Sequence, residues 1–269
     1  MKTRFLQLIL AALVVCGLSV FTSCTKEDNP ATPDLNVRLT QKHLITYANG
    51  ALFFSGTEDY LWKDGLLRSI NVSTTMYTTG NTSGSTNTYV YDDNGNCIEE
   101  HHFSEGSTSL KSDAYFVYDE QGRMTSAVEK NAKGEINQKV TITGYTDDGH
   151  IQALTEENFL LDYVVEHQLT WKDGDMIGFS SHYLTPGQKD RNVTIEYDDY
   201  PNYSTGMPLA SNVFDPLYIA FNASVHNLYA QGQEFYYANG RVVKAELVED
   251  NLQIISYFTY SDGTTGKVK

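Results

Sequence analysis

Apolar and polar residues alternate along most of this chain, in short runs separated by polar turns that contain a glycine. Residues 114–124 show the pattern: an alternating run ends at Tyr118, a polar turn closes at Gly122, and Met124 begins the next run. Most of the turn glycines directly follow Asn or Asp, and this pair supplies the positive φ angles of a tight hairpin turn. Alternation with a period of two on both sides of such a turn predicts a β-hairpin.

The same unit recurs along the chain, with an aromatic residue just before each turn. These aromatic residues are Tyr47, Trp62, Tyr91, Tyr118, Tyr145, Trp171, Tyr197, Tyr237 and Tyr260. From Tyr91 to Tyr197 the steps between them are 27, 27, 26 and 26 residues, by subtraction of those positions. A fixed period of this size indicates a repeat architecture. The first two are only 15 residues apart, which predicts short strands at the start.

Two further sets of residues accompany the aromatic residues, and the first set shares their face because side chains two apart on a strand point the same way. The first set lies two positions before it: Ile45, Tyr60, Tyr89, Phe116, Thr143, Leu169, Ile195, Phe235 and Phe258. The second lies two positions after the turn glycine, where only Thr265 is not apolar: Leu52, Leu67, Cys97, Met124, Ile151, Met176 and Val242. We therefore expect one buried face that includes Tyr91, Phe116, Tyr118, Trp171 and Tyr197. Each buried side chain stabilises the stacking of hairpins by about 1.5–3 kcal/mol.

Helical periodicity is nearly absent from the chain, because the apolar residues recur at two rather than at three and four. Nine turn signals, each flanked by two strands, predict roughly sixteen to eighteen strands. The predicted fold is all-β: a single repeat domain over residues 37–269, built as an antiparallel up-and-down meander of hairpins. A sheet of that length is expected to curl, or to close into a barrel-like sheet.

The repeat breaks at residues 199–233, where the glycine is lost and an irregular excursion separates Tyr197 from Tyr237. A short helix is expected near residues 215–219. Long connections of this kind are often functional, but a cap over an apolar sheet edge is an equally open interpretation. If the chain has a ligand, its aromatic contacts are expected from Tyr200, Tyr203 and Tyr218 in this excursion. The alternative is that these rings pack the excursion onto the sheet.

Residues 1–23 have the features of a signal peptide. Two basic residues precede an apolar run at 6–21 that is too short for a comfortable membrane span. The run ends at Cys24, in a context that resembles the lipobox of bacterial lipoproteins, where the cysteine thiol carries lipid. Residues 24–36 then form a lipidated tether and linker, and residues 25–28 resemble an export signal to the cell surface. For the apolar run, an ordinary secretory signal or a short anchor helix remains open, and for residues 25–28 the open alternative is a plain solvated tether.

The composition excludes some partners. The chain has 19 basic and 34 acidic residues, a net charge of −15. Loss of residues 1–23 removes two basic residues and no acidic one, which gives −17 for the mature chain. Nucleic acid is not an expected partner, because phosphate binding requires clustered Lys and Arg. With Cys24 acylated, Cys97 has no cysteine to pair with, and it occupies a repeat position where other units carry aliphatic residues, so we expect a small buried hydrophobe.

No catalytic or metal-binding constellation stands out. His101 and His102 are adjacent on a predicted strand, so their side chains point to opposite faces and cannot easily chelate one metal. Residues 92–96 superficially resemble a calcium loop but lack its acidic twelfth ligand. A glycosidase needs two carboxylates at a set spacing in a cleft, and the sequence singles out no acidic pair for that role. The chain also has no nucleophile-elbow, phosphate-loop or Cys-x-x-Cys motif. We expect no catalytic residues, no metal and no cofactor.

The Tyr-Asp-x-x-Gly-Arg form of residues 118–123 resembles the tyrosine–aspartate repeats of large bacterial secreted toxins. Taken together, the lipobox, the tether and the degenerate hairpins resemble a family of Bacteroidetes envelope lipoproteins of unknown function with a porin-like fold. The resemblance implies a curled antiparallel sheet that is lipid-anchored at the outer membrane or cell surface, and it brings no catalytic or binding residues. The function expected is a non-catalytic surface binding or scaffolding lipoprotein with a glycan or protein ligand. The alternative is an envelope enzyme that acts on polysaccharide.

Overall fold

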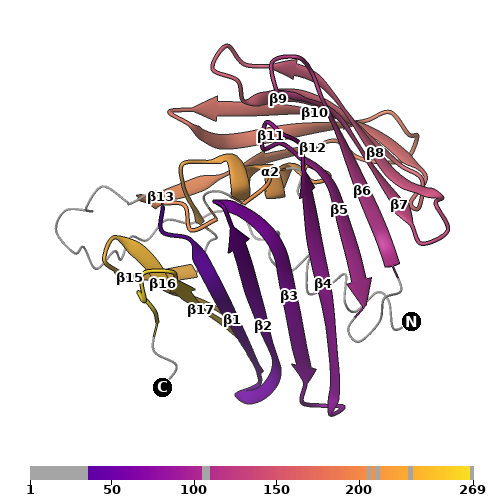
Figure 1. Cartoon of the computed structure of the whole chain (residues 1–269). Helices are drawn as coiled ribbons and strands as arrows, with labels where there is room; N and C mark the ends of the chain where they lie inside the picture. The colour runs from indigo at the N-terminus through magenta and orange to yellow at the C-terminus, as the bar shows by residue number, and fades with distance from the viewer. Residues whose placement is uncertain (1–35, 105–109, 205–206, 210–212, 230–232, 267–269) are drawn as a thin grey trace.

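The computed structural model describes residues 36–104, 110–204, 207–209, 213–229 and 233–266. The predicted signal peptide, the predicted lipidation site Cys24 and all but the last residue of the predicted tether lie outside these residues. The described part is built from antiparallel strands and one short helix, α2 (Figure 1).

Fifteen of the strands form one large sheet in the order β12 to β1 and then β17, β16 and β15, so the first strand pairs with the last. A separate two-stranded sheet joins β13 and β14. The bounds are β1 (Leu39–Ala48), β2 (Ala51–Lys63), β3 (Leu66–Met76), β4 (Asn81–Tyr91), β5 (Cys97–Ser104), β6 (Leu110–Tyr118), β7 (Met124–Asn131), β8 (Ile136–Tyr145), β9 (Ile151–Asn158), β10 (Tyr163–Lys172), β11 (Asp175–Tyr183), β12 (Arg191–Thr194), β13 (Glu196–Pro201), α2 (Pro216–Ala223), β14 (His226–Tyr229), β15 (Gln233–Ala238), β16 (Arg241–Glu249) and β17 (Leu252–Tyr260).

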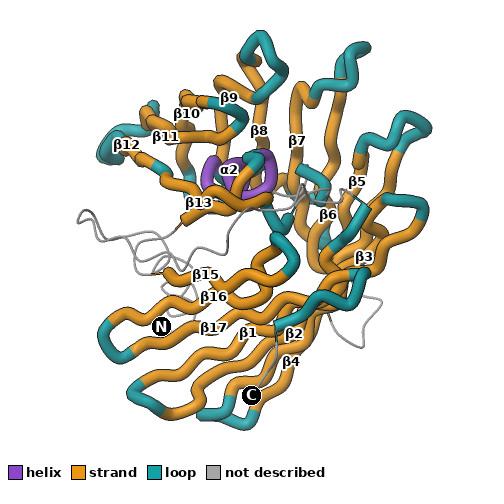
Figure 2. Tube along the Cα trace, turned by 90° about the vertical axis from the view of Figure 1, so that its left-hand side faces the viewer, coloured by secondary structure: helices purple, strands orange, loops and turns teal. Residues whose placement is uncertain are grey.

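The predicted fold class is therefore confirmed. The described strands number seventeen, within the predicted sixteen to eighteen, and they run up and down as a meander. The sheet curls but does not close, since β12 and β15 form its two edges. Figure 2, turned by 90°, shows the strands arranged around α2, which lies on the inner side of the curl.

β-Bulges follow the repeat turns that form hairpins in the large sheet, and they contribute to its curl. In the unit of Tyr118, this ring lies opposite Met124, and the next pair joins Val117 to Ser126, so Thr125 is the extra residue. The same offset follows the turns after Trp62, Tyr91, Tyr145, Trp171 and Tyr237. A bulge bends its strand and increases the local twist. These six bulges lie at one end of the sheet, which we call the repeat-turn end. Three more lie at the opposite end, after Tyr47, between β5 and β6, and between β7 and β8, so both ends contribute to the twist.

The inner face is joined by a ladder of hydrogen bonds between successive units. The ring of Tyr118 donates from its hydroxyl to the backbone oxygen of Cys97 at 2.8 Å, and Cys97 is the apolar position of the preceding unit. Seven aromatic side chains make such a bond to a carbonyl: Trp62 to Leu39, Tyr91 to Leu67, Tyr118 to Cys97, Tyr145 to Met124, Trp171 to Ile151, Tyr197 to Met176, and Tyr260 to Val242. The ladder therefore satisfies the polar tip of each ring while its apolar body packs in the core.

The predicted buried face is confirmed for the regular units. Phe116 is buried, and Tyr91, Tyr118, Trp171 and Tyr197 pack against the core in half-buried positions. The post-turn residues are buried as well, from Leu67 and Cys97 to Met124, Ile151, Met176 and Val242.

The predictions for the first unit are wrong. The turn after Tyr47 lies at the end of the sheet opposite the other repeat turns, because β2 alone separates it from the turn after Trp62. The 15-residue step therefore marks one strand of 13 residues rather than two short ones. Leu52 is 37% exposed, and Ile45 is only half-buried, away from the core.

Thr143 also departs from its predicted inner position. It lies at an irregularity between β8 and β9, where Ile142 pairs with Leu154 and Gly144 with Ala153. Thr143 is consequently exposed, and Ile142 packs against the core in its place.

Candidate functional site

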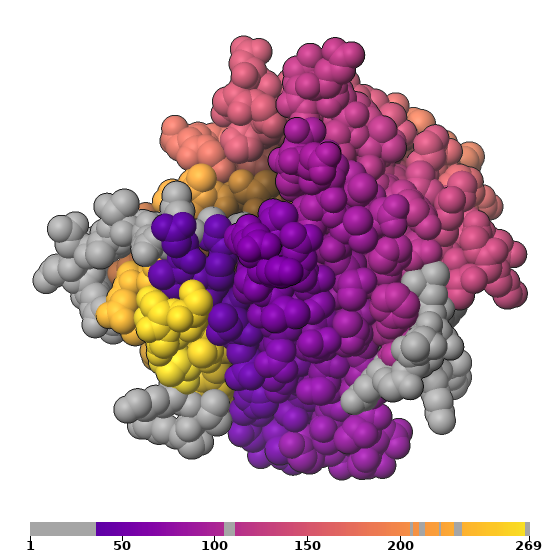
Figure 3. Space-filling model, viewed as in Figure 1, coloured from indigo at the N-terminus to yellow at the C-terminus, as the bar shows by residue number. Residues whose placement is uncertain are grey.

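The described part of the excursion, residues 199–204, 207–209, 213–229 and 233, packs against the inner side of the curled sheet. Its helix α2 confirms the predicted one: Asp215 caps the N-terminus by accepting from the backbone N–H of Leu217 at 2.9 Å, and Pro216 occupies the first turn. Ile219 and Ala220 of the helix are fully buried in the core. In Figure 3 the orange residues of this region lie recessed between the strands that surround them.

Polar contacts fix the excursion to the sheet. The Asp175 carboxylate at the start of β11 accepts from the backbone N–H of His226 at 3.0 Å and contacts the His226 ring Nδ1 at 2.7 Å. Asp198 accepts from the hydroxyl of Tyr237 and from the side-chain amide of Asn227. Burial raises the pKa of Asp198, and these hydrogen bonds oppose the shift. The excursion is therefore held in a defined position.

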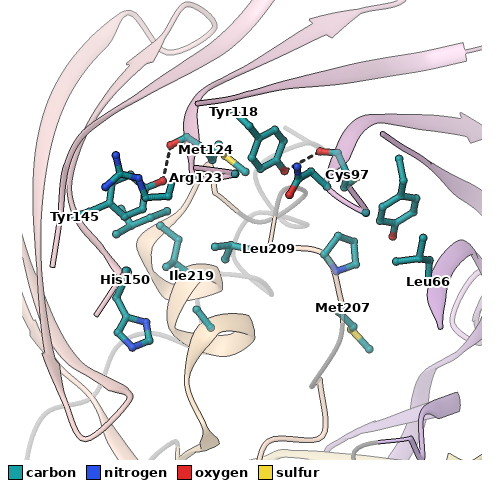
Figure 4. Close-up of a pocket in the computed structure, with 18 of the residues that line it drawn as sticks. Leu66, Cys97, Tyr118, Arg123, Met124, Tyr145, His150, Met207, Leu209 and Ile219 are labelled. Atoms are coloured by element: carbon teal, nitrogen blue, oxygen red, sulfur yellow. Dashed lines mark hydrogen bonds between the residues drawn. The ribbon is translucent and has the colours of Figure 1, made fainter. Parts of the chain in front are cut away.

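A groove of about 390 Å³ lies between the repeat-turn end of the sheet and the excursion. One wall comes from successive units and the other from residues 207–209 and α2, as the close-up in Figure 4 shows. The side chains and turn glycines that line it are Leu66, Tyr91, Gly95, Asn96, Cys97, Tyr118, Gly122, Arg123, Met124, Tyr145, Gly149, His150, Ile151, Trp171, Met207, Pro208, Leu209, Ile219 and Ala223.

The aromatic rings of the groove are fixed in place and uncharged. The hydroxyl groups of Tyr118 and Tyr145 are bound to ladder carbonyls, so the rings cannot easily rotate away. Burial is the main cause that raises the pKa of Tyr118 above its ordinary value and that of Tyr145 to about 12. Near neutral pH the groove therefore presents neutral, half-buried rings in a row that follows the repeat.

Two cationic or titratable side chains lie against these rings. The guanidinium of Arg123 lies 5.2 Å from the centre of the Tyr145 ring and is held by the carboxylate of Asp119 at 2.8 Å. His150 stacks on Trp171 with 4.3 Å between ring centres. The groove thus combines apolar surface with hydrogen-bond donors at its rim, a composition common in binding sites for small molecules.

The chemistry available in the groove favours binding. Cys97 is buried, and burial raises the pKa of its thiol to about 12, so the reactive thiolate is disfavoured. None of the described residues that line the groove is a carboxylate. Across the described ranges, no group of three or more His, Cys, Asp and Glu side chains has the geometry of a metal site.

The three predicted ligand-contacting tyrosines lie outside this groove. Tyr200 stacks on Tyr237 with 3.6 Å between ring centres. Tyr203 packs on Phe258 at 4.6 Å, and burial raises the pKa of Tyr203. Tyr218 is 43% exposed on α2. Their role in binding stays a prediction, and the excursion reaches the groove through other residues, which follow no sequence pattern: Met207, Pro208, Leu209, Ile219 and Ala223.

A buried polar cluster on β9, β10 and β11 was not predicted from the sequence. His167 contacts Ser181 Oγ through Nδ1 at 2.9 Å and Glu156 Oε2 through Nε2 at 3.2 Å. Glu156 also accepts from Tyr163 and Gln138, and Gln138 donates to the backbone oxygen of Phe214 in the excursion. The signal for it was a set of polar residues at inward positions of three neighbouring strands.

This cluster has the residue types of a nucleophile–base–acid relay, but its setting is structural. Ser181 is 2% exposed, and His167 and Glu156 are 4% and 5% exposed. None of the three lines the groove. Through Gln138 the cluster ties the inner face of the sheet to the excursion, so its hydrogen bonds position the second wall of the groove.

Comparisons with known proteins bear on the fold. No protein-family model matches the chain, and no curated protein matches it. The crystal structure of a porin-like protein from Bacteroides uniformis is similar, with a TM-score of 0.53 and 11% identity over 83% of this chain and 98% of that one. The crystal structure of TcdB2-TccC3-TEV has a TM-score of 0.31 and 14% identity, over 77% of this chain and 12% of that one.

The first similarity confirms the porin-like fold that the sequence resemblance implied. At this identity it shows the fold alone. The second is too distant in structure to support any argument. Among the described residues, no helix has the length and hydropathy needed to cross a membrane.

Proposed function

We propose that this chain is a lipid-anchored protein of the bacterial cell envelope that binds a glycan in the groove and does not catalyse a reaction on it. The observation that supports binding is the row of half-buried aromatic rings, held by the ladder and joined by Arg123, His150 and Asn96. Flat aromatic faces pack on the apolar faces of sugar rings, while donors at the rim meet hydroxyl groups.

The groove also argues against the alternative of an envelope enzyme acting on polysaccharide. Most glycoside hydrolases use two carboxylates that flank the scissile bond. The described residues that line this groove include no Asp or Glu. Three carboxylates contact its lining side chains: Asp92 accepts from Asn96, Asp119 pairs with Arg123, and Asp148 lies 3.6 Å from His150. Binding without turnover is therefore the function that this chemistry supports.

The location rests on the sequence. Cys24 follows a short apolar run and resembles a lipoprotein acylation site, and several acyl chains would anchor a protein stably. The strongly acidic composition of the chain opposes electrostatic docking to anionic lipid, so the acyl chains would have to supply the attachment to the membrane. We propose the outer membrane or the cell surface as the compartment.

Lipidation is tested by metabolic labelling with a fatty-acid probe in a bacterium that processes lipoproteins. We expect the parent chain to be labelled and the Cys24→Ala variant to lose the label. Equal labelling of both chains would rule out Cys24 as the attachment site.

Binding is tested by screening the purified protein on glycan and peptide arrays, with a panel of glycoside hydrolase assays on the same material. We expect stable binding to a glycan without release of reducing ends. Turnover without stable binding would favour the enzyme, and binding confined to peptides would replace the glycan with a protein ligand.

A further inference from the structure

Large apolar side chains gather at the end of the sheet opposite the groove. They come from the ends of three hairpins, β7–β8, β9–β10 and β11–β12. Neighbouring ends are joined by backbone hydrogen bonds, from Phe159 to Asn137 and from Leu184 to Val164, both at 2.9 Å. We call this group the apolar tip; its residues and exposures are Ile136 43%, Phe159 53%, Leu160 69%, Leu161 61% and Leu184 51%.

The composition of the β9–β10 turn is unusual for its place. Turns normally carry Gly, Asn, Asp or Ser, which suit their backbone angles and solvent exposure. Here three successive apolar residues, 159–161, stand more than half exposed. The turn itself is held by other groups: Asn158 accepts from the backbone N–H of Leu161 at 2.9 Å, and Asp162 adopts the positive φ of 54°. The apolar side chains are therefore not required to form the turn.

Two of the carboxylates beside the tip form ion pairs, and the exposed carboxylate of Asp162 lies in the turn itself. Glu157 contacts Lys139 at 3.0 Å, and Asp190 contacts His182 at 2.9 Å. Pairing lowers the cost of bringing these carboxylates close to an apolar medium. Other exposed apolar residues, such as Leu61 at 58% and Val117 at 54%, lie singly on non-neighbouring strands, as is usual on protein surfaces.

We propose that the apolar tip inserts into the surface of the lipid bilayer that carries the proposed anchor at Cys24. This inference rests on the proposed envelope location. The thirteen residues 24–36 can span up to about 45 Å, more than the roughly 33 Å of a ten-residue strand. An anchored chain can therefore bring either end of its sheet to the bilayer.

The size of the tip favours a bilayer over a second copy of the chain. Five side chains are far fewer than the roughly 20–30 residues per side in a stable protein interface. A lipid surface sets no such minimum, because a few apolar side chains at a loop end can enter the boundary between head groups and acyl chains.

The test uses the mature chain with Cys24→Ala, so that no acyl chain contributes and the result is independent of the labelling experiment. Co-sedimentation with phosphatidylcholine vesicles measures the partition coefficient. We expect the double variant Leu160→Ser/Leu161→Ser to lower it by about tenfold or more, since two exposed leucines lose their apolar burial in lipid. The matched control Leu61→Ser/Val117→Ser replaces two apolar residues outside the tip that are also more than half exposed, and it should bind like the parent.

Thermal unfolding of each variant shows that the fold is kept, which is expected because the turn is held by Asn158 and Asp162. The proposal is overturned if the parent does not sediment with vesicles, or if the tip variant and the control bind equally. Sedimentation velocity without lipid tests whether the tip instead binds a second copy of the chain. Self-association that the tip variant abolishes would assign the tip to a second copy of the chain instead.

Discussion

The ladder predicts that removing one buried hydroxyl group will destabilise the fold measurably. In Tyr260→Phe the ring stays in place, but its hydroxyl no longer donates to the backbone oxygen of Val242 at 2.8 Å. Tyr260 is 4% exposed and Val242 is 0% exposed, so water cannot easily replace the lost donor. Leaving a buried acceptor without this partner costs about 1–3 kcal/mol.

That loss is large enough to measure by thermal unfolding. For a domain of this size, 1 kcal/mol corresponds to a shift in Tm of about 2–4 °C, so we expect Tm to fall by about 2–12 °C. The matched control is Tyr236→Phe, which removes a hydroxyl bonded to Glu234 at 3.0 Å on a residue that is 41% exposed. Its Tm should stay within about 1 °C of the parent, as for most surface changes. Equal Tm values for the two variants would refute the stabilising role of the ladder.

Three further outcomes follow from burial and backbone geometry. Burial raises the pKa of Glu100 from 4.5 to about 7. Between these two pH values the folded state binds more protons than the unfolded state, so the free energy of unfolding falls as pH rises. In urea titrations between about pH 5 and pH 8, Glu100→Gln should remove that fall. A Cβ on Gly178 would lie 2.5 Å from the backbone oxygen of Val193, so Gly178→Ala should lower the urea midpoint by displacing β12. The buried Cys97 thiol should react with a thiol reagent only after denaturation, and rapid labelling of the native protein would contradict its position.

Much of the fold could be predicted because the residues that form each hairpin lie close together in the sequence. In the unit of Tyr118, the carboxylate of Asp119 accepts from the backbone N–H groups of Gln121 and Arg123, both at 2.9 Å, and shapes the turn. The ring then lies opposite Met124 across the hairpin. These contacts are local, so a pattern within a dozen residues is enough to predict them.

The direction of a hairpin is not local, and this is why the first unit was wrongly interpreted. A turn signal does not show at which end of the sheet it lies. The step from Tyr47 to Trp62 is about half of the regular period and therefore contains one strand, which places the two turns at opposite ends. The length of this step therefore indicates that the two turns lie at opposite ends of the sheet.

A sequence pattern marks the hydrogen-bond donors of the ladder and could have predicted them. The nine repeat positions before the turns hold only Tyr or Trp, the aromatic residues with a donor at the tip, whereas Phe occurs two positions earlier, as at Phe116. The acceptor could not be identified in the same way. It belongs to the preceding unit, and which carbonyl comes within reach depends on strand register and on the bulge after each turn.

The groove could be predicted only in part. One wall follows from the repeat, since Tyr118 and Tyr145 stand at equivalent positions of successive units. The other wall depends on how the excursion packs, and residues such as Met207 and Leu209 carry no periodic signal. Sequence reasoning selected the excursion for its tyrosines, but the tertiary contacts bring other residues of it to the groove.

The central claim, that the groove binds a glycan, is tested most directly by titration calorimetry with the glycan that binds most tightly on the array. The double variant Arg123→Ala/His150→Ala removes two rim side chains and should weaken binding by about tenfold or more, since each lost hydrogen bond contributes about 0.5–1.5 kcal/mol. The control Arg191→Ala removes an arginine that also lies over an aromatic ring, Phe179 at 5.5 Å, but outside the groove, and it should bind like the parent. Unchanged affinity in the double variant, with its fold intact, would contradict the assignment of the groove.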